Sequence, residues 1–243
     1  MKELGSTGER IPVVGMGTYG IGGRTAPDRS LNTEAVNALK LGFSLGMRFV
    51  DTAEMYGAGN SEELVGQAVR GSHSEVFVAT KVSPEHFDYE GVLRAADRSL
   101  KRLGIKCIDL YQLHWPSSSI PIRETMRAME RLQSAGKIRH VGVSNFSVEQ
   151  TVEAQKALSK GQVVSNQVEY NLISRGIERD LLGYCERSKI TVIAYTPLGR
   201  GRFSEPSGSA PMQLLRDIAR KHGKTPCQIA LAWVIARNTV VAI

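Results

Sequence analysis

Residues 48–80 read RFVDTAEMYGAGNSEELVGQAVRGSHSEVFVAT and set the pattern for the rest of the chain. Two short runs, RFVD from Arg48 and VFVAT from Val76, enclose a segment of helical periodicity that begins near Ser61. A strand, a helix and a second strand in this order form the unit from which parallel sheets are built. The stretch therefore predicts two parallel strands joined by an outer helix.

The same alternation continues along the chain and gives eight predicted strands. The six others are VVGMG from Val13, IDLYQLH from Ile108, IRHVGVS from Ile138, VVSNQVEY from Val163, TVIAYT from Thr191 and TVVAI from Thr239. Further helices are predicted over residues 33–45, 122–135, 147–158 and 177–188, from near Met212, and up to the glycine stop at Gly104. Eight parallel strands predict an α/β fold of the (β/α)8 TIM barrel type, as a single domain over residues 1–243.

The two ends of the chain carry further expectations. Residues 2–11, KELGSTGERI, read as two short polar strands around a turn, and we expect this β-hairpin to plug the N-terminal mouth of the barrel. The chain ends at Ile243 with the eighth predicted strand, whereas a closed unit has a helix after it. We therefore expect a truncated barrel without its C-terminal helix, and apolar surface on the flank between the first and last strands.

Composition limits the classes of function. The net charge is +7, but lysine and arginine are scattered over predicted helix faces, which argues against a nucleic-acid partner. The charge still favours an anionic ligand such as a dinucleotide phosphate. The N-terminus lacks a signal-peptide core, and no run of about eighteen apolar residues is present. We expect a cytoplasmic monomer that binds no membrane.

Cysteine usage and one glycine motif exclude two other sites. Cys107, Cys185 and Cys227 are far apart and lack the spacing of a disulfide framework or a zinc site, so no metal is predicted. Residues 15–20, GMGTYG, match the Rossmann pattern GxGxxG. We reject a Rossmann turn because IGGRTAPDR does not begin a helix and no acidic residue ends a strand about twenty residues further on. These glycines more simply allow the backbone to approach a ligand.

Four polar residues stand at strand ends or just after them. Asp51 ends the second predicted strand, Tyr56 follows it, Lys81 ends the third strand and His114 ends the fourth. Functional groups of a (β/α)8 barrel occupy this end of the strands. Each residue alone has a structural reading as a loop cap, a packing group, a surface charge or a satisfied polar group. Together they predict one site, in which pairing with Asp51 explains a buried lysine.

These residue types suit proton transfer coupled to reduction of a carbonyl. A tyrosine hydroxyl beside Lys81 is expected to have its pKa lowered from about 10, which makes Tyr56 a better general acid. Lys81 would stabilise the tyrosinate and be held by Asp51, while His114 would orient the substrate oxygen.

Six runs of the sequence resemble the aldo-keto reductase family in order and spacing. They are FVDTAEMYG, VATKV, SLKRLGIKCIDLYQLHWP, IRHVGVSNF, NQVEYN and VIAYTPLGRG. The resemblance covers nearly the whole chain. It implies hydride transfer from NADPH, with NADH as the alternative, to the carbonyl of a small aldehyde or ketone. It further implies that Tyr56 is the general acid/base and that Asp51, Lys81 and His114 complete a catalytic tetrad.

The resemblance also implies a set of cofactor-binding residues. Those that match the positions bonded to the nicotinamide carboxamide are Ser144, Asn145 and Gln167, and Tyr195 matches the aromatic that stacks on the ring. Those that match the segment over the pyrophosphate are Thr196, Leu198 and Arg200, while Gly17, Thr18 and Asp51 lie beside the cofactor. In the family the grip on the 2′-phosphate or ribose follows the eighth strand, where this chain ends, so the choice of NADPH over NADH rests on the family.

Aromatic residues and one long loop border the expected site. The expected substrate pocket contains Tyr19, Tyr56, His114, Trp115 and Phe146. For Tyr19, Trp115 and Phe146, a purely structural packing role is a fair alternative. The short loop WPSSSIP predicts an open pocket with broad aldehyde or ketone scope. The Gly/Pro/Ser-rich segment 196–211 is either a mobile loop over the site or a solvated spacer.

Two other functions compete with a catalytic reductase. One is a cofactor-binding regulatory subunit resembling the potassium-channel β-subunits, which share this fold and tetrad. The other is a (β/α)8 enzyme such as a phosphosugar isomerase, with TPLGRG as its phosphate loop. The isomerase reading gives no role to the tyrosine, lysine and histidine together.

Overall fold

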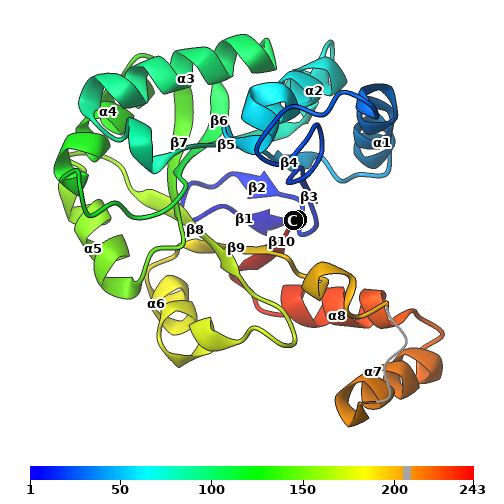
Figure 1. Cartoon of the computed structure of the whole chain (residues 1–243). Coiled ribbons are helices and arrows are strands. Elements are labelled where there is room, and N and C mark those ends of the chain that lie inside the picture. Colours follow the sequence, from blue (N-terminus) through cyan, green and yellow to red (C-terminus); the bar gives the residue numbers. More distant parts are fainter. Residues whose placement is uncertain (205–208) are drawn as a thin grey trace.

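The computed structural model describes residues 1–204 and 209–243. Eight parallel strands form one curved sheet in which hydrogen-bonded neighbours follow chain order (Figure 1). The strands are β3 (Met16–Gly17), β4 (Phe49–Asp51), β5 (Phe77–Val82), β6 (Ile108–Leu113), β7 (Ile138–Ser144), β8 (Val163–Glu169), β9 (Thr191–Tyr195) and β10 (Val240–Ala242). All eight predicted strands are present, and the predicted α/β class is confirmed.

The first and last strands meet and close the barrel. Val14 and Ala242 form a parallel bridge just before β3. The amide of Gly15 donates to the carbonyl of Ala242 at 2.8 Å, and the amide of Ala242 donates to the carbonyl of Val13 at 2.9 Å. This contact joins β10 to the chain entering β3, so the predicted (β/α)8 barrel is confirmed.

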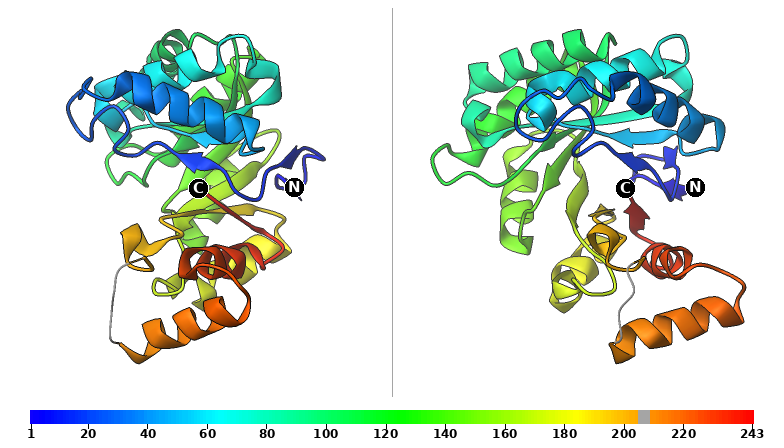
Figure 2. Two further views of the ribbon diagram at one scale, coloured as in Figure 1. Left: turned by 90° about the vertical axis from the view of Figure 1, so that its right-hand side faces the viewer. Right: turned by 45° about the vertical axis from the view of Figure 1, so that its right-hand side comes forward.

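Helices surround the sheet on its outer side (Figure 1). They are α1 (Asn32–Ser44), α2 (Asn60–Val69), α3 (Tyr89–Leu103), α4 (Ile122–Ser134), α5 (Val148–Ala157), α6 (Leu181–Arg187), α7 (Ala210–Lys221) and α8 (Pro226–Ile235). The segment predicted as helical from near Met212 divides into α7 and α8. Gly223 has a φ of +61° between them, and Thr225 starts α8 with a capping box to Gln228. Figure 2 shows α7 outside α8, away from the barrel.

The seam between β3 and β10 is flanked by α1 and α8 in both figures. On α1 and at its end, Leu41 and Leu45 are exposed. Apolar surface therefore lies on the helix that follows the first strand.

The N-terminal hairpin consists of β1 (Lys2–Glu3) and β2 (Arg10–Ile11), which pair antiparallel. Figure 1 shows it within the ring of strands. Leu4 and Ile11 are fully buried in one apolar cluster with inward-facing strand residues such as Phe49. The amide of Gly5 donates to the hydroxyl of Thr191 at 2.8 Å, at the start of β9. The predicted plug is thus present and apolar on its inner side.

Strand alternation decides which side chains enter the barrel. On β5, Phe77 and Ala79 belong to the inner cluster with the hairpin, whereas Val78 and Val82 pack outward against the helices. Lys81 shares parity with Phe77 and Ala79, so its side chain enters the barrel above the apolar layer. The same alternation places Asp51 above Phe49 on β4.

A β-bulge breaks this alternation between β7 and β8. Val141 pairs with Val163, whereas the next residue, Gly142, pairs with Ser165. Val164 faces inward in the hairpin cluster, and Gln167, three residues later, also faces inward because it bonds to Asp51. Two residues of the same regular strand that are three apart would face opposite sides. The bulge therefore turns Gln167 into the barrel.

We predict that Leu4→Ala lowers the free energy of unfolding by about 2–5 kcal/mol, because it leaves a cavity under the barrel. Urea unfolding of this variant measures the loss. The matched control is Leu31→Ala, since Leu31 is exposed and its truncation should change stability by less than about 0.5 kcal/mol. Equal effects of the two substitutions would show that the hairpin does not plug the barrel.

Candidate active site

Lys81 lies at the centre of the four predicted catalytic residues and is 0% exposed. Its ammonium group is 2.5 Å from Asp51 Oδ1, 2.9 Å from the carbonyl oxygen of Thr52 and 3.3 Å from the hydroxyl of Tyr56. Three polar partners compensate the loss of water around the buried cation. The close contact of Lys81 with both Asp51 and Tyr56 is the geometry that the sequence predicted.

His114 lies directly after β6 and forms the other wall of this cluster. Its ring is 5.6 Å from that of Tyr56, edge to face, and stacks on Trp115 with ring centroids 3.8 Å apart. Its side chain is buried, and its Nδ1 has no hydrogen-bond partner among the described residues. The structure thus brings Asp51, Tyr56, Lys81 and His114 together at one mouth.

The charged form of Lys81 is the favoured one. Burial alone would lower the pKa of the amine, but Asp51 and then Tyr56 raise the pKa of Lys81 above its usual value. Lys81 is therefore an ammonium ion at neutral pH.

The pKa of Tyr56 corrects one expectation. Burial raises the pKa of the Tyr56 hydroxyl, and the opposing effect of Lys81 is smaller, so the net pKa is above 10 rather than below it. The expected lowering rested on the Lys81 cation alone, whereas the loss of solvent around the buried phenol has the larger effect on its pKa. Tyr56 is thus a protonated phenol at neutral pH, which is the form that can donate a proton.

Burial also controls the charge of His114. Loss of solvent, followed by repulsion from the Lys81 ammonium, lowers the pKa of His114 to about 2. The imidazole is therefore neutral at physiological pH and has one N–H to donate.

Asp51 has partners on both of its carboxylate oxygens. Oδ1 contacts Lys81, while Oδ2 accepts hydrogen bonds from Gln112 at 3.0 Å and from Gln167 at 2.8 Å. Gln112 was missed by sequence reasoning, although it lies two residues before His114 and therefore shares its face of β6. That spacing was the signal that could have found it.

The residues expected to contact the nicotinamide form one hydrogen-bonded cluster. Asn145 donates to the carbonyl oxygen of His114 and to the hydroxyl of Ser144, both at 3.1 Å, and accepts from the hydroxyl of Tyr195 at 3.0 Å. The hydroxyl of Ser144 donates to the carbonyl oxygen of Gln167 at 2.9 Å. These contacts link the ends of β7, β8 and β9 beside the tetrad.

Most of the strained backbone positions lie at the same end of the strands, whereas Lys189 precedes β9 at the other end. Five non-glycine residues in the described part of the chain have positive φ: Ala58, Asn145, Lys189, Thr196 and Arg200. Three of them are expected cofactor residues. Strained conformations of this kind concentrate at ligand sites because surrounding structure must enforce them. Leu198 and Arg200 lie at the surface, and part of the predicted loop 196–211 lies outside the described residues.

The end of the first strand lies against the tetrad. Gly17 pairs in register with Asp51, and the hydroxyl of Thr18 donates to the carbonyl oxygen of Asp51 at 3.1 Å. Thr18 also accepts from the hydroxyl of Ser61 at 2.8 Å and is buried. The side chain of Thr18 therefore braces β4, and its hydroxyl proton is used within the protein.

The expected aromatic wall is only partly present. Tyr19 is 64% exposed and lies 5.2 Å from the ring of Tyr56, and Trp115 is 39% exposed. Phe146, in contrast, is 3% exposed and belongs to the apolar core under the outer helices. The expectation that Phe146 lines the pocket is therefore wrong, because its side chain packs in the core.

Glu54 is a second residue that the sequence analysis missed. Its carboxylate accepts from the amide of Ser83 and lies within bonding distance of His86, both at 2.9 Å, and it pairs with Arg98 at 3.4 Å. Glu54 thus ties the loop that carries Tyr56 to the loop that follows Lys81. Its position within DTAEMYG was the available signal.

Asn171 is a third such residue and is also buried. It donates to the carbonyl oxygen of Thr196 at 3.1 Å and accepts from the amides of Ile173 and Ser174. Asn171 therefore holds the positive-φ turn after β9.

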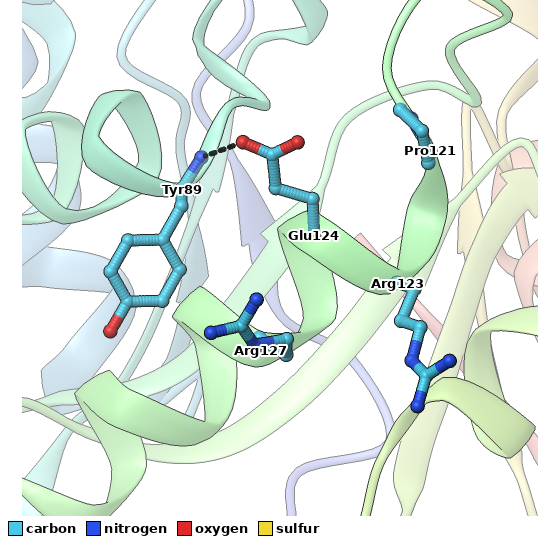
Figure 3. A pocket seen from close by; sticks show the side chains of 5 residues that line it. All are labelled: Tyr89, Pro121, Arg123, Glu124 and Arg127. Carbon is cyan, nitrogen blue, oxygen red and sulfur yellow. Dashed lines mark hydrogen bonds between the residues drawn. The ribbon is translucent and has the colours of Figure 1, made fainter.

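A hollow of about 560 Å³ lies on the outer surface between α3 and α4 (Figure 3). Its lining residues are Tyr89, Pro121, Arg123, Glu124 and Arg127. The amide of Tyr89 donates to Glu124 at 3.0 Å, and the guanidinium of Arg127 lies 5.5 Å from the Tyr89 ring. The hollow includes none of the residues predicted for the site.

Comparison with known proteins assigns the family. The family model "Aldo/keto reductase family" matches residues 13–243. The chain therefore belongs to the aldo/keto reductase family of oxidoreductases, as the sequence resemblance indicated. None of the helices in the described part of the chain combines the length and hydropathy that a membrane-spanning helix needs.

Relatives with known names agree with this family. The methylglyoxal reductase YeaE of Escherichia coli K12 is 40% identical over 234 residues, which are 96% of this chain and 80% of that protein. The thermostable aldo-keto reductase Tm1743, crystallised with the inhibitor epalrestat, has a TM-score of 0.94 and 43% identity, covering 100% of this chain and 87% of that chain. An aldo-keto reductase from Klebsiella pneumoniae in complex with NADPH has a TM-score of 0.87 and 38% identity, covering 96% and 80%.

We predict that neutral, buried His114 makes stability depend on pH. Its pKa of about 2 in the folded state lies below the unfolded value of about 6.5, so the unfolded chain binds more protons between these values. The stabilisation is complete above about pH 6.5 and is lost as the pH falls. Between pH 7.5 and pH 5 the wild type should therefore lose about 2 kcal/mol more stability than His114→Gln does.

Denaturant unfolding at the two pH values measures this difference. His222→Gln is the control, because His222 is exposed on the surface after α7 and the variant should follow the wild-type profile. Parallel profiles for the wild type and His114→Gln would contradict a neutral, buried imidazole.

Proposed function

We propose that this protein reduces small aldehydes and ketones, with Tyr56 as the proton donor and NADPH as the hydride donor. The observation that carries the proposal is the 3.3 Å contact between the Tyr56 hydroxyl and a fully buried Lys81 that is itself bound to Asp51. Family membership supports the reaction class, and the NADPH complex of the Klebsiella pneumoniae relative supports the cofactor.

The residues beside the tetrad fit a nicotinamide. The carbonyl oxygen Oε1 of Gln167 accepts no hydrogen bond from any described residue, although the side chain is buried, so it can accept from a carboxamide N–H. Tyr195 lies at the end of β9 and presents a half-buried ring. When bound there, the cofactor supplies a hydride to the carbonyl carbon.

The protein's own residues would manage the proton. Tyr56 donates its hydroxyl proton to the carbonyl oxygen, so that hydride on carbon and proton on oxygen together give the alcohol. Lys81 stabilises the phenolate that forms when Tyr56 loses its proton, and Asp51 holds Lys81 in place. Neutral His114 donates one N–H to the same carbonyl oxygen and orients it. The low solvent exposure of Tyr56, Lys81, Asp51 and His114 strengthens each of these interactions.

Substrate scope follows from the exposed aromatic residues. Tyr19 and Trp115 border the tetrad but remain open to solvent, which favours small carbonyl compounds without strict shape selection. The name of the relative YeaE, a methylglyoxal reductase, supports a small substrate. We propose a monomeric, cytoplasmic enzyme. The reductases among the relatives disfavour the regulatory-subunit alternative, and family membership removes the phosphosugar isomerase.

We predict that Tyr56→Phe lowers kcat for a test aldehyde by about 10²–10⁴-fold, because the variant lacks the hydroxyl proton that is transferred to the carbonyl oxygen. Oxidation of NADPH, followed by absorbance, measures the rate. Tyr89→Phe is the matched control, since Tyr89 lines the outer hollow and the variant should keep wild-type activity (Figure 3). Full turnover in Tyr56→Phe would refute the assignment of the acid.

We also predict that the protein binds NADPH more tightly than NADH. The extra phosphate of NADPH adds negative charge, which the net charge of +7 favours. Titration of nicotinamide fluorescence with each cofactor gives the two affinities. An equal or stronger affinity for NADH would overturn the proposed cofactor preference.

A further inference from the structure

Gln112 occupies the centre of the barrel but belongs to no predicted catalytic or cofactor group. It lies on β6 between Leu110, which faces the apolar layer above the hairpin, and His114. Its side chain is fully buried. A buried amide costs free energy unless its hydrogen bonds are made, so its partners indicate what it does.

Within the described part of the chain, the side chain of Gln112 has two partners. They are Asp51, which binds Lys81, and Gln167, which belongs to the expected nicotinamide cluster. Its amide nitrogen donates to Asp51 Oδ2 at 3.0 Å. Its carbonyl oxygen accepts from the amide nitrogen of Gln167 at 3.4 Å. The amide nitrogen of Gln167 also donates to the same Oδ2 at 2.8 Å. The three side chains thus form a closed triangle.

This triangle fixes the direction of the Asp51 carboxylate. Oδ2 is held by two amide donors, which leaves Oδ1 directed at the ammonium of Lys81. Hydrogen bonds to an ionised acceptor are stronger than those between neutral groups. Without Gln112, one donor to a buried charge would be lost, and the carboxylate could turn away from Lys81.

The triangle also fixes which end of Gln167 faces the cofactor side. Both uses of the Gln167 amide nitrogen are within the triangle, so its carbonyl oxygen remains as a free acceptor. A flip of either glutamine would set an amide oxygen, which carries partial negative charge, against the negatively charged carboxylate of Asp51, and the two oxygens would repel. Each glutamine therefore holds the other in one orientation.

We propose that Gln112 is a positioning residue that aims Asp51 at Lys81 and keeps the carbonyl oxygen of Gln167 available to the cofactor. The proposal rests on the proposed function, because it concerns the same site. It assigns to Gln112 no contact with the substrate or the cofactor. Its effect on the reaction is carried by Asp51 and Gln167.

Two substitutions separate hydrogen bonding from packing. Gln112→Met has a similar length but cannot make these hydrogen bonds, so we expect NADPH to bind about 5-fold more weakly and kcat to fall about 10-fold. Gln112→Glu keeps the shape and places a carboxyl group beside Asp51. At low pH the protonated carboxyl donates as the amide does, and at high pH its charge repels Asp51. Its kcat should therefore approach the wild-type value at low pH and fall as the pH rises.

The control is Leu113→Met, a change of similar volume at the next residue of β6, which is buried but faces outward against the helices. It should leave NADPH affinity and the pH profile of kcat unchanged. Nicotinamide fluorescence measures the affinity, steady-state rates from about pH 5.5 to 9 give the profile, and urea unfolding shows that each variant is folded.

The outcomes distinguish this inference from the proposed function. Wild-type affinity in Gln112→Met together with a wild-type pH profile in Gln112→Glu would overturn the role of Gln112, while Tyr56→Phe would still test the reductase. A purely structural role would weaken stability in both variants without a pH-dependent recovery in Gln112→Glu. If the wild type neither bound NADPH nor reduced an aldehyde, the proposed function and this inference would both fail.

Discussion

The contact between buried Lys81 and Asp51 is the constraint on which the rest of the site depends. Two charges withdrawn from water are costly, and their attraction compensates only when further hydrogen bonds satisfy them. Here the carbonyl oxygen of Thr52 accepts one hydrogen bond from the ammonium, while Gln112 and Gln167 donate hydrogen bonds to the second oxygen of the carboxylate. Several strands must therefore end at the right height for a lysine to remain charged inside the barrel.

The same burial sets the protonation state of each neighbour. A phenol, an imidazole and an amine respond differently to the loss of water, because burial disfavours whichever form is charged. Tyr56 keeps its proton and His114 stays neutral. Lys81 is charged, because Asp51 and Tyr56 together raise its pKa by more than burial lowers it. A proton donor, a neutral hydrogen-bond donor and a cation thus stand side by side at one pH.

The residues that stabilise the fold and the residues of the site occupy opposite ends of the same strands. The hairpin residues Leu4 and Ile11 fill the lower mouth with apolar side chains, together with Phe49 and Phe77. Asp51 and Lys81 lie two and four residues further along the same strands, at the upper mouth. Separation of this kind is general in (β/α)8 barrels, where one face supports the fold and the other carries function.

The sequence alone determined the eight strands, the plug and the meeting of Asp51, Tyr56, Lys81 and His114. The alternation of strands and helices can be read locally, and parallel strands joined by helices end at one mouth. Only the tertiary structure decided the rest. The bulge before Gln167 depends on register between β7 and β8. The bonds of Gln112 run across the barrel interior to residues of β4 and β8, neither of which is paired with β6. The core position of Phe146 and the raised pKa of Tyr56 follow from burial, which is set by the whole assembled barrel and is not encoded in any single stretch.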